Sequence, residues 1–178
     1  MSKTIETATF GGGCFWCIDA AFRRVKGVTN VSSGYTGGET DAPTYQQICT
    51  GLTGHAEVVN IEFDSSEISY ESLLAMFFTL HDATQLNRQG NDIGTQYRSV
   101  VYFHNDEQHT QTADYIAQLQ NQIREKIVTE VSPATTFYPA EQYHQDYYEQ
   151  NPEQGYCSIL IAPKLQRFEK DYKQFLKD

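Results

Sequence analysis

A cysteine that follows three glycines and precedes two aromatic residues is the feature of this sequence best suited to chemistry. Residues 10–17 read Phe-Gly-Gly-Gly-Cys-Phe-Trp-Cys. Glycine permits a sharp backbone turn and leaves the next side chain uncrowded. Apolar residues then recur at helical spacing as far as Val25, so Cys14 is expected in the first turn of a helix. Because the free N–H groups and positive dipole end of a helix start favour a thiolate, Cys14 is predicted to be a nucleophile rather than a core cysteine.

Three other segments carry polar groups that such a nucleophile could use. Glu57 lies just inside a predicted strand, Asp92 and Tyr97 flank a glycine loop, and Tyr45 follows Pro-Thr at the end of an earlier loop. Taken singly, each has a structural explanation: a solvated strand-end carboxylate, a turn-forming aspartate, and tyrosines at the edge of the core. It is their combination with Cys14 that suggests a catalytic site.

The elements that would position these residues alternate irregularly between strand and helix. Strands are expected at 5–10, 28–34, 56–63 and 97–103, and helices after Cys14, after Ser69, from Asp106 and over 165–175. Residues 82–96 show no apolar period and are predicted to be a long loop without strands, of the kind that often carries function. The pattern predicts an α+β fold with helices packed on a mixed sheet.

Length, charge and cysteine content restrict the function further. The 178 residues suit a single domain over 1–178, and the net charge of −10 argues against nucleic acid or an anionic membrane surface as partner. Neither a secretory signal nor a membrane span is visible, so a cytoplasmic location is expected. Four cysteines in a reducing compartment indicate catalysis, metal binding or core packing rather than a disulfide scaffold.

These segments belong to a longer series that resembles the methionine sulfoxide reductase A family, the peptide methionine (S)-S-oxide reductases. The series spans nearly the whole chain in the family's order: Gly13-Cys-Phe-Trp16, Gly34-Tyr-Thr-Gly37, Pro43-Thr-Tyr45, Gly54-His-Ala-Glu57, residues 90–99, Tyr143-His-Gln-Asp-Tyr147 and Gly155-Tyr-Cys157. Chance does not produce agreement over seven ordered segments. The resemblance implies a ferredoxin-like two-layer core with added C-terminal elements.

The resemblance also implies the role of each site residue. Cys14 would be the nucleophile and Glu57 the general acid. The apolar wall for the substrate methyl group would come from Phe15 and Trp16. The polar side of the pocket would be completed by Tyr45, Asp92 and Tyr97. A thiolate must attack sulfur while a proton reaches oxygen, and an acid buried among aromatic rings has its pKa raised for that step. No metal or cofactor is expected, since the glycines lack the spacing of a phosphate-binding loop.

The product would be methionine, with a sulfenic acid on Cys14 that a second cysteine converts to a disulfide for thioredoxin to reduce. Cys17 stands where many family members carry glycine, but a helix at this spacing resists disulfide geometry. Cys157 matches the family's resolving cysteine and follows 151–156, a stretch with Pro and Gly that is expected to be mobile. A Cys14–Cys157 disulfide is therefore predicted, with Cys17 as a backup and Cys49 as a small buried residue.

The substrates implied are the S epimers of free and protein-bound methionine sulfoxide, reduced in the repair of oxidative damage. The sequence does not indicate the oligomeric state, and a monomer is the default expectation. Two other interpretations stay open. One is a thioredoxin-like disulfide oxidoreductase that uses Cys14 and Cys17. The other is a zinc-binding interaction module built from Cys14, Cys17 and two of Cys49, Cys157, His55 and His144.

Overall fold

The computed structural model describes residues 4–177. Its strands and helices, in chain order, are β1 (Ile5–Gly11), α1 (Phe15–Arg23), β2 (Val28–Thr36), α2 (Tyr45–Cys49), β3 (Ala56–Asp64), α3 (Tyr70–Leu80), β4 (Arg88–Gln89), β5 (Asp92–Ile93), β6 (Val100–Phe103), α4 (Asp106–Gln120), β7 (Glu130–Pro133), β8 (Tyr138–Pro139), α5 (Tyr147–Gln150) and α6 (Ala162–Asp171). Short 3₁₀ turns occupy Thr95–Tyr97, Gln142–His144 and Lys173–Phe175, and a π-helical turn, Cys157–Ile161, leads directly into α6.

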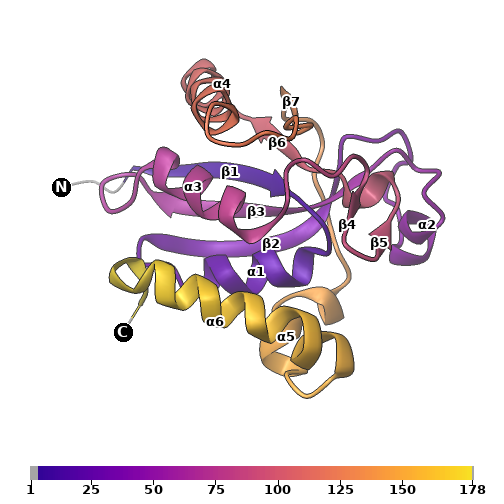
Figure 1. Ribbon diagram of the computed structural model, residues 1–178. Coiled ribbons are helices and arrows are strands. Elements are labelled where there is room, and N and C mark those ends of the chain that lie inside the picture. The colour runs from indigo at the N-terminus through magenta and orange to yellow at the C-terminus, as the bar shows by residue number, and fades with distance from the viewer. Residues whose placement is uncertain (1–3, 178) are drawn as a thin grey trace.

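The strands form a mixed sheet, as the sequence predicts. The larger sheet has the order β7-β6-β1-β3-β2-β8 (Figure 1). Strands β6 and β7 run parallel, whereas the other neighbours are antiparallel. Strand β1 lies between β3 and β6, so its C-terminal end, which leads to Cys14, is held from both sides.

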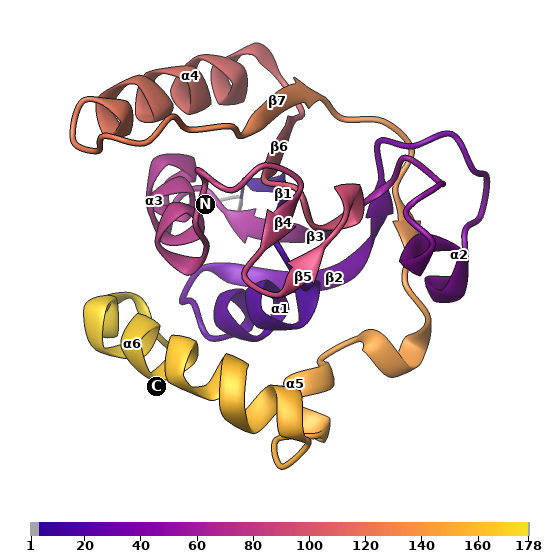
Figure 2. The same cartoon turned by 45° about the vertical axis from the view of Figure 1, so that its right-hand side comes forward.

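Helices enclose the end of β1. Helix α1 packs against β2 and β3 and against α5 and α6, and α3 contacts α1, α4 and α6. Figure 2 shows α5 and α6 curving along one side of α1, with α4 beyond α3 beside β6 and β7. The ring of Phe10 in β1 stacks on Phe77 in α3 with centroids 4.8 Å apart. Within residues 4–177, no helix combines the length and apolar character needed to cross a bilayer.

The prediction that 82–96 lacks strands is wrong. This segment contains the hairpin β4–β5, in which Arg88 pairs with Ile93 and Gln89 with Asp92. Its turn includes Gly90 at φ +56°, a left-handed conformation that glycine adopts without strain. Strands of two residues are too short to produce an apolar period, so pattern analysis could not detect them.

Candidate active site

The glycines before Cys14 are required by close packing. Gly13 has φ +81°, and its N–H donates to the carbonyl oxygen of Tyr97 at 3.1 Å. A Cβ on Gly12 would lie 2.7 Å from the ring of His81. The chain can therefore pass between these neighbours only without side chains, and this passage delivers Cys14 to the start of α1.

Cys14 occupies the N-cap position of α1, with φ −66° and ψ 129°, rather than its first turn. Its thiol is only partly exposed. Burial raises the pKa of Cys14 well above its usual value, the charges of Glu57 and Asp92 act in the same direction, and the Trp16 backbone N–H acts against them. The expected thiolate is therefore not favoured in the resting site, because desolvation outweighs the helix start.

Glu57 reaches the same place from the sheet. It pairs with Tyr35 across β2 and β3, and strand alternation puts it on the face of Val59, Ile61 and Phe63, which lie in the main core. Only 1% of the residue is exposed. One carboxyl oxygen, Oε1, accepts the backbone N–H of Phe15 at 3.3 Å, and Oε2 has no partner among the described residues.

Burial raises the pKa of Glu57 to about 8, with the Phe15 N–H acting against this and Asp92 adding to it. A carboxyl with this pKa is mostly protonated at pH 7 and can donate a proton. The interpretation of Glu57 as a solvated strand-end carboxylate is thereby excluded.

The aromatic residues after Cys14 have different surroundings. Phe15 is completely buried, so its ring lies behind any surface pocket in this conformation. Trp16 is partly exposed, stacks on Tyr147 with ring centroids 3.8 Å apart, and donates its indole N–H to Nδ1 of His144 at 3.0 Å. Because an indole N–H can only donate, His144 Nδ1 must accept, which leaves the imidazole proton on Nε2. His144 thus fixes the orientation of Trp16.

The remaining predicted residues are Tyr45, Tyr97 and Asp92. The pKa of Tyr45 and that of Tyr97 are raised first by burial and then by the charge of Glu57. The backbone N–H of Tyr45 donates to Oε2 of Glu141 at 3.1 Å. Asp92 lies on β5 and accepts the hydroxyl of Tyr156 at 2.6 Å.

Sequence reasoning did not single out Tyr156, and it considered His144 only as a possible zinc ligand. Tyr156 lines the same cavity as Cys14 and its hydroxyl donates to Asp92, and burial and then Cys14 raise its pKa. Both residues lie in segments that carry the family resemblance, Gly155-Tyr-Cys157 and Tyr143-His-Gln-Asp-Tyr147, and this was the available signal.

A cavity of about 400 Å³ opens beside Cys14. Its walls come from the end of β1, the start of α1, the hairpin β4–β5 and the start of α6, and include Cys14, Cys17, Asp92, Tyr156 and Lys164. Glu57, Tyr45 and Tyr97 lie outside this lining. The thiol therefore stands between two environments, the buried acid with its tyrosines and an open hollow.

The other cysteines differ from expectation in two respects. Cys157 is 0% exposed and begins a helical turn packed into the core, so its thiol is not accessible from solvent in this state. Cys49 is exposed, not buried, and ends the short helix α2. All four cysteines are free thiols, and burial raises the pKa of Cys17 to about 11 although the charge of Lys164 acts against this.

The two histidines considered for a zinc site have other partners, His144 being bonded to Trp16. His55 accepts the backbone N–H of Gly38 at 3.0 Å and contacts the carbonyl of Thr40 at 2.6 Å, far along the chain from α1. In the part of the chain that the structure describes, no group of three or more His, Cys, Asp or Glu side chains is arranged to hold a metal ion.

This fold and site, with a cysteine at a helix start beside a buried carboxylic acid, are those of an oxidoreductase. Comparison with known proteins specifies the family. The model of the peptide methionine sulfoxide reductase family matches residues 6–176. The peptide methionine sulfoxide reductase MsrA of Acinetobacter baumannii (strain SDF) is 55% identical over 174 residues, which cover 98% of this chain and 99% of the relative. That of Saccharolobus solfataricus is 50% identical over 97% of this chain and 98% of the relative.

Solved structures agree. Mxr1 from Saccharomyces cerevisiae in reduced form has a TM-score of 0.80 at 34% identity, covering 86% of this chain and 89% of that one. Methionine sulfoxide reductase A of Corynebacterium diphtheriae has a TM-score of 0.77 at 36% identity, covering 87% and 78%. The chain belongs to the peptide methionine sulfoxide reductase family and is an oxidoreductase that reduces methionine sulfoxide. The thioredoxin-like alternative is thereby excluded.

Proposed function

We propose that the protein reduces the S epimer of free and protein-bound methionine sulfoxide, with Cys14 as nucleophile and Glu57 as general acid. The observation that carries this proposal is Glu57 itself: a carboxyl that is 1% exposed, with one oxygen unpartnered and a pKa of about 8, beside a cysteine at a helix start. Burying an unpaired polar oxygen is costly, so such a group is retained for chemistry rather than for stability.

The chemical step transfers one oxygen atom. Cys14 sulfur attacks the sulfoxide sulfur while Glu57 delivers its proton to the sulfoxide oxygen and then takes up the proton of the thiol. The hydroxyl passes from the substrate sulfur to Cys14 sulfur as the transient bond between the two sulfurs breaks, which leaves methionine and a sulfenic acid on Cys14, so the substrate sulfur gains the two electrons that Cys14 loses. Tyr45 and Tyr97, whose raised pKa keeps them neutral, would hold that oxygen, and Trp16 with Phe15 behind it would form the apolar wall for the methyl group.

The experiment that tests this is a single turnover without reductant on each separate epimer of methionine sulfoxide. Wild type should release one methionine per enzyme from the S epimer and gain one sulfenic acid or disulfide. Cys14→Ser should release none. Turnover of the R epimer at an equal rate would contradict the proposed stereochemistry.

For recycling, Cys157 is proposed to attack the sulfenic acid, releasing water and forming a Cys14–Cys157 disulfide that thioredoxin reduces. The yeast protein Mxr1 is known in complex with Trx2, and we carry that partner over to this chain. Since Cys157 is buried, its approach requires the segment before α6 to move.

One observation favours Cys17 as the alternative resolving residue. It lines the same cavity as Cys14 and is the third residue of α1, and N-cap side chains commonly reach toward that third position. The objection from helix spacing does not apply to an N-cap residue with extended backbone. Peptide mapping after one equivalent of substrate decides: a Cys14–Cys17 disulfide in wild type, with Cys157→Ser still recycled by thioredoxin, would replace Cys157 in this role.

The organisation and location of the protein follow the same family pattern. We infer a single domain over 1–178, a monomer, a cytoplasmic location and a role in repairing oxidised methionine, without metal or cofactor. The order β6-β1-β3-β2 with α1 and α3 in the connections supports a ferredoxin-like core. Size-exclusion chromatography with light scattering tests the monomer.

A further inference from the structure

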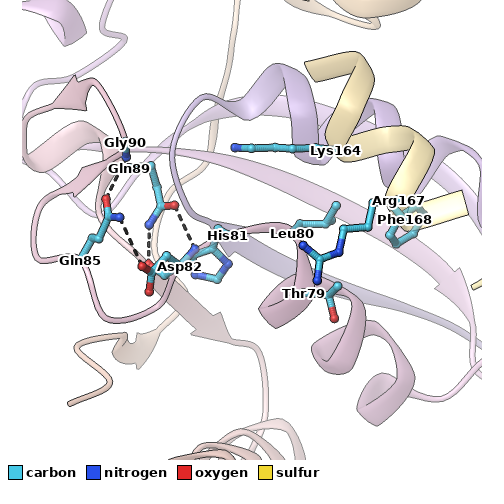
Figure 3. A pocket seen from close by; sticks show the side chains of 10 residues that line it. All are labelled: Thr79, Leu80, His81, Asp82, Gln85, Gln89, Gly90, Lys164, Arg167 and Phe168. Atoms are coloured by element: carbon cyan, nitrogen blue, oxygen red, sulfur yellow. Dashed lines mark hydrogen bonds between the residues drawn. The ribbon is translucent and has the colours of Figure 1, made fainter. Parts of the chain in front are cut away.

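A second hollow, here called the distal pocket, continues from the cavity beside Cys14. It has a volume of about 370 Å³ and lies between the end of α3, the loop that leads into β4–β5, and α6 (Figure 3). The two hollows share Leu80, Gln89, Gly90 and Lys164 in their linings. They therefore form one groove that starts at the nucleophile and passes Lys164 at the junction.

The walls of the distal pocket differ in hydrogen-bonding capacity. On the loop side the polar groups bond to one another: Asp82 accepts from the backbone N–H and the hydroxyl of Thr84 at 2.9 and 2.5 Å, and from Gln85 Nε2 at 3.2 Å. Gln89 bonds the backbone N–H and carbonyl of Asp82 at 3.0 and 2.5 Å. Gln85 Oε1 accepts the N–H of Gly90 at 2.8 Å.

His81 is likewise occupied. Its Nδ1 must donate to the carbonyl of Phe77 at 2.8 Å, so its Nε2 accepts from Ser99 at 2.7 Å. Burial lowers the pKa of His81 to about 4, and the ring is neutral at physiological pH. His81 contributes neither charge nor a free donor to the pocket.

The unused donors come from α6. Lys164 makes no hydrogen bond or ion pair with any residue of 4–177, and Arg167 has only a contact of 4.0 Å with Asp171 while its side chain is 83% exposed. Figure 3 shows Lys164 extending toward Gly90, and Arg167 toward Thr79 and Leu80. On a chain of net charge −10, two cations that face one pocket favour an anionic ligand beside α6. The Asp82 carboxylate lies on the opposite wall of the pocket.

We propose that the distal pocket is a subsite for polypeptide substrates, in which Lys164 and Arg167 bind an acidic side chain near the oxidised methionine. This rests on the proposed function at Cys14. The groove is continuous with the cavity beside Cys14, so a chain whose methionine sulfoxide reaches Cys14 can place a neighbouring residue against α6. Acidic flanking residues would then raise kcat/KM, and free methionine sulfoxide, which has no flanking residue to place beside Arg167, would not sense that cation.

The test compares three substrates with dithiothreitol as reductant, so that thioredoxin docking does not enter. They are free methionine S-sulfoxide and two otherwise identical peptides that carry glutamate or lysine beside the oxidised methionine. Exposed ion pairs are individually weak, so with two cations wild type should prefer the glutamate peptide by about two- to thirtyfold. The preference should shrink at 0.5 M salt, where screening is strong.

Arg167 lines only the distal pocket. Arg167→Glu should reduce or invert the preference for the glutamate peptide, when each peptide rate is normalised to the same variant's rate on free methionine sulfoxide. Lys164→Glu should act in the same direction. Lys170→Glu, on the same helix but outside the pocket lining, is the matched control and should keep the wild-type ratio.

Equal rates on the two peptides in wild type, or a ratio that Arg167→Glu and Lys170→Glu change alike, would overturn the subsite and leave the proposed function intact. Failure of wild type to reduce free methionine sulfoxide would overturn the proposed function and the subsite with it.

Discussion

Replacing Glu57 with glutamine should remove the acid while keeping the size of the side chain and its hydrogen bond to Phe15. With a pKa of about 8, Glu57 is about 90% protonated at pH 7, whereas at its ordinary value of 4.5 only about 0.3% would be. Burial therefore raises the population of the acid about 300-fold. General acid catalysis is typically worth about a hundred- to ten-thousand-fold, so Glu57→Gln should slow the oxygen transfer by that order.

The assay is the single-turnover rate of methionine release from methionine S-sulfoxide between pH 5 and 10. In wild type the rate should fall above about pH 8, as Glu57 loses its proton. The single-turnover rate of Glu57→Gln should be much lower at every pH and should not fall above about pH 8. Glu62→Gln, an exposed residue on the same strand, is the matched control and should keep the wild-type profile.

A second readout separates acid catalysis from an effect on the nucleophile. Alkylation of Cys14 by iodoacetamide needs the thiolate but no acid. Because the charge of Glu57 raises the pKa of Cys14, its removal should leave alkylation equal or faster. If alkylation and sulfoxide reduction slow by the same factor, Glu57 supports the thiolate or the fold, and the acid role is refuted.

Cys14→Ser should abolish methionine release, since serine cannot form the sulfenic acid. Measurable turnover would show that another residue is the nucleophile. Trp16→Ala should raise KM for methyl sulfoxides more than for bulkier alkyl sulfoxides, measured on a matched series, and an identical response would reject the methyl wall. His144→Phe should leave the indole N–H of Trp16 unpaired and lower the free energy of unfolding by about 1–3 kcal/mol, whereas His144→Asn keeps an acceptor. Urea unfolding measures this loss in each variant, and the fluorescence of Trp16, the single tryptophan, reports the surroundings of its indole ring. The raised pKa of Glu57 means that the folded state retains a proton that the unfolded state has lost between about pH 4.5 and 8, so the stability of wild type relative to Glu57→Gln should fall by about 1.4 kcal/mol per pH unit in this window.

Local sequence determined where the chain turns and which residues start the site. Three glycines before Cys14 imply a backbone passage that excludes side chains, and the structure shows why, with His81 filling the space that a Cβ on Gly12 would need. Alternation along 57–63 likewise determined that Glu57 shares a face with core residues. Such features depend on a few neighbouring residues, so they are visible in the sequence before any folding.

Tertiary structure decided the electrostatics and the distant partners. The helix start alone predicts a stabilised thiolate at Cys14, but packing around it removes water, and the cost of desolvating a charge exceeds the benefit of the dipole. The bond between Trp16 and His144 joins residues that are 128 positions apart. The burial of Cys157 and the meeting of α6 with the hairpin β4–β5 depend in the same way on how distant segments pack, because solvent exclusion is a property of the assembled fold rather than of any short stretch of sequence.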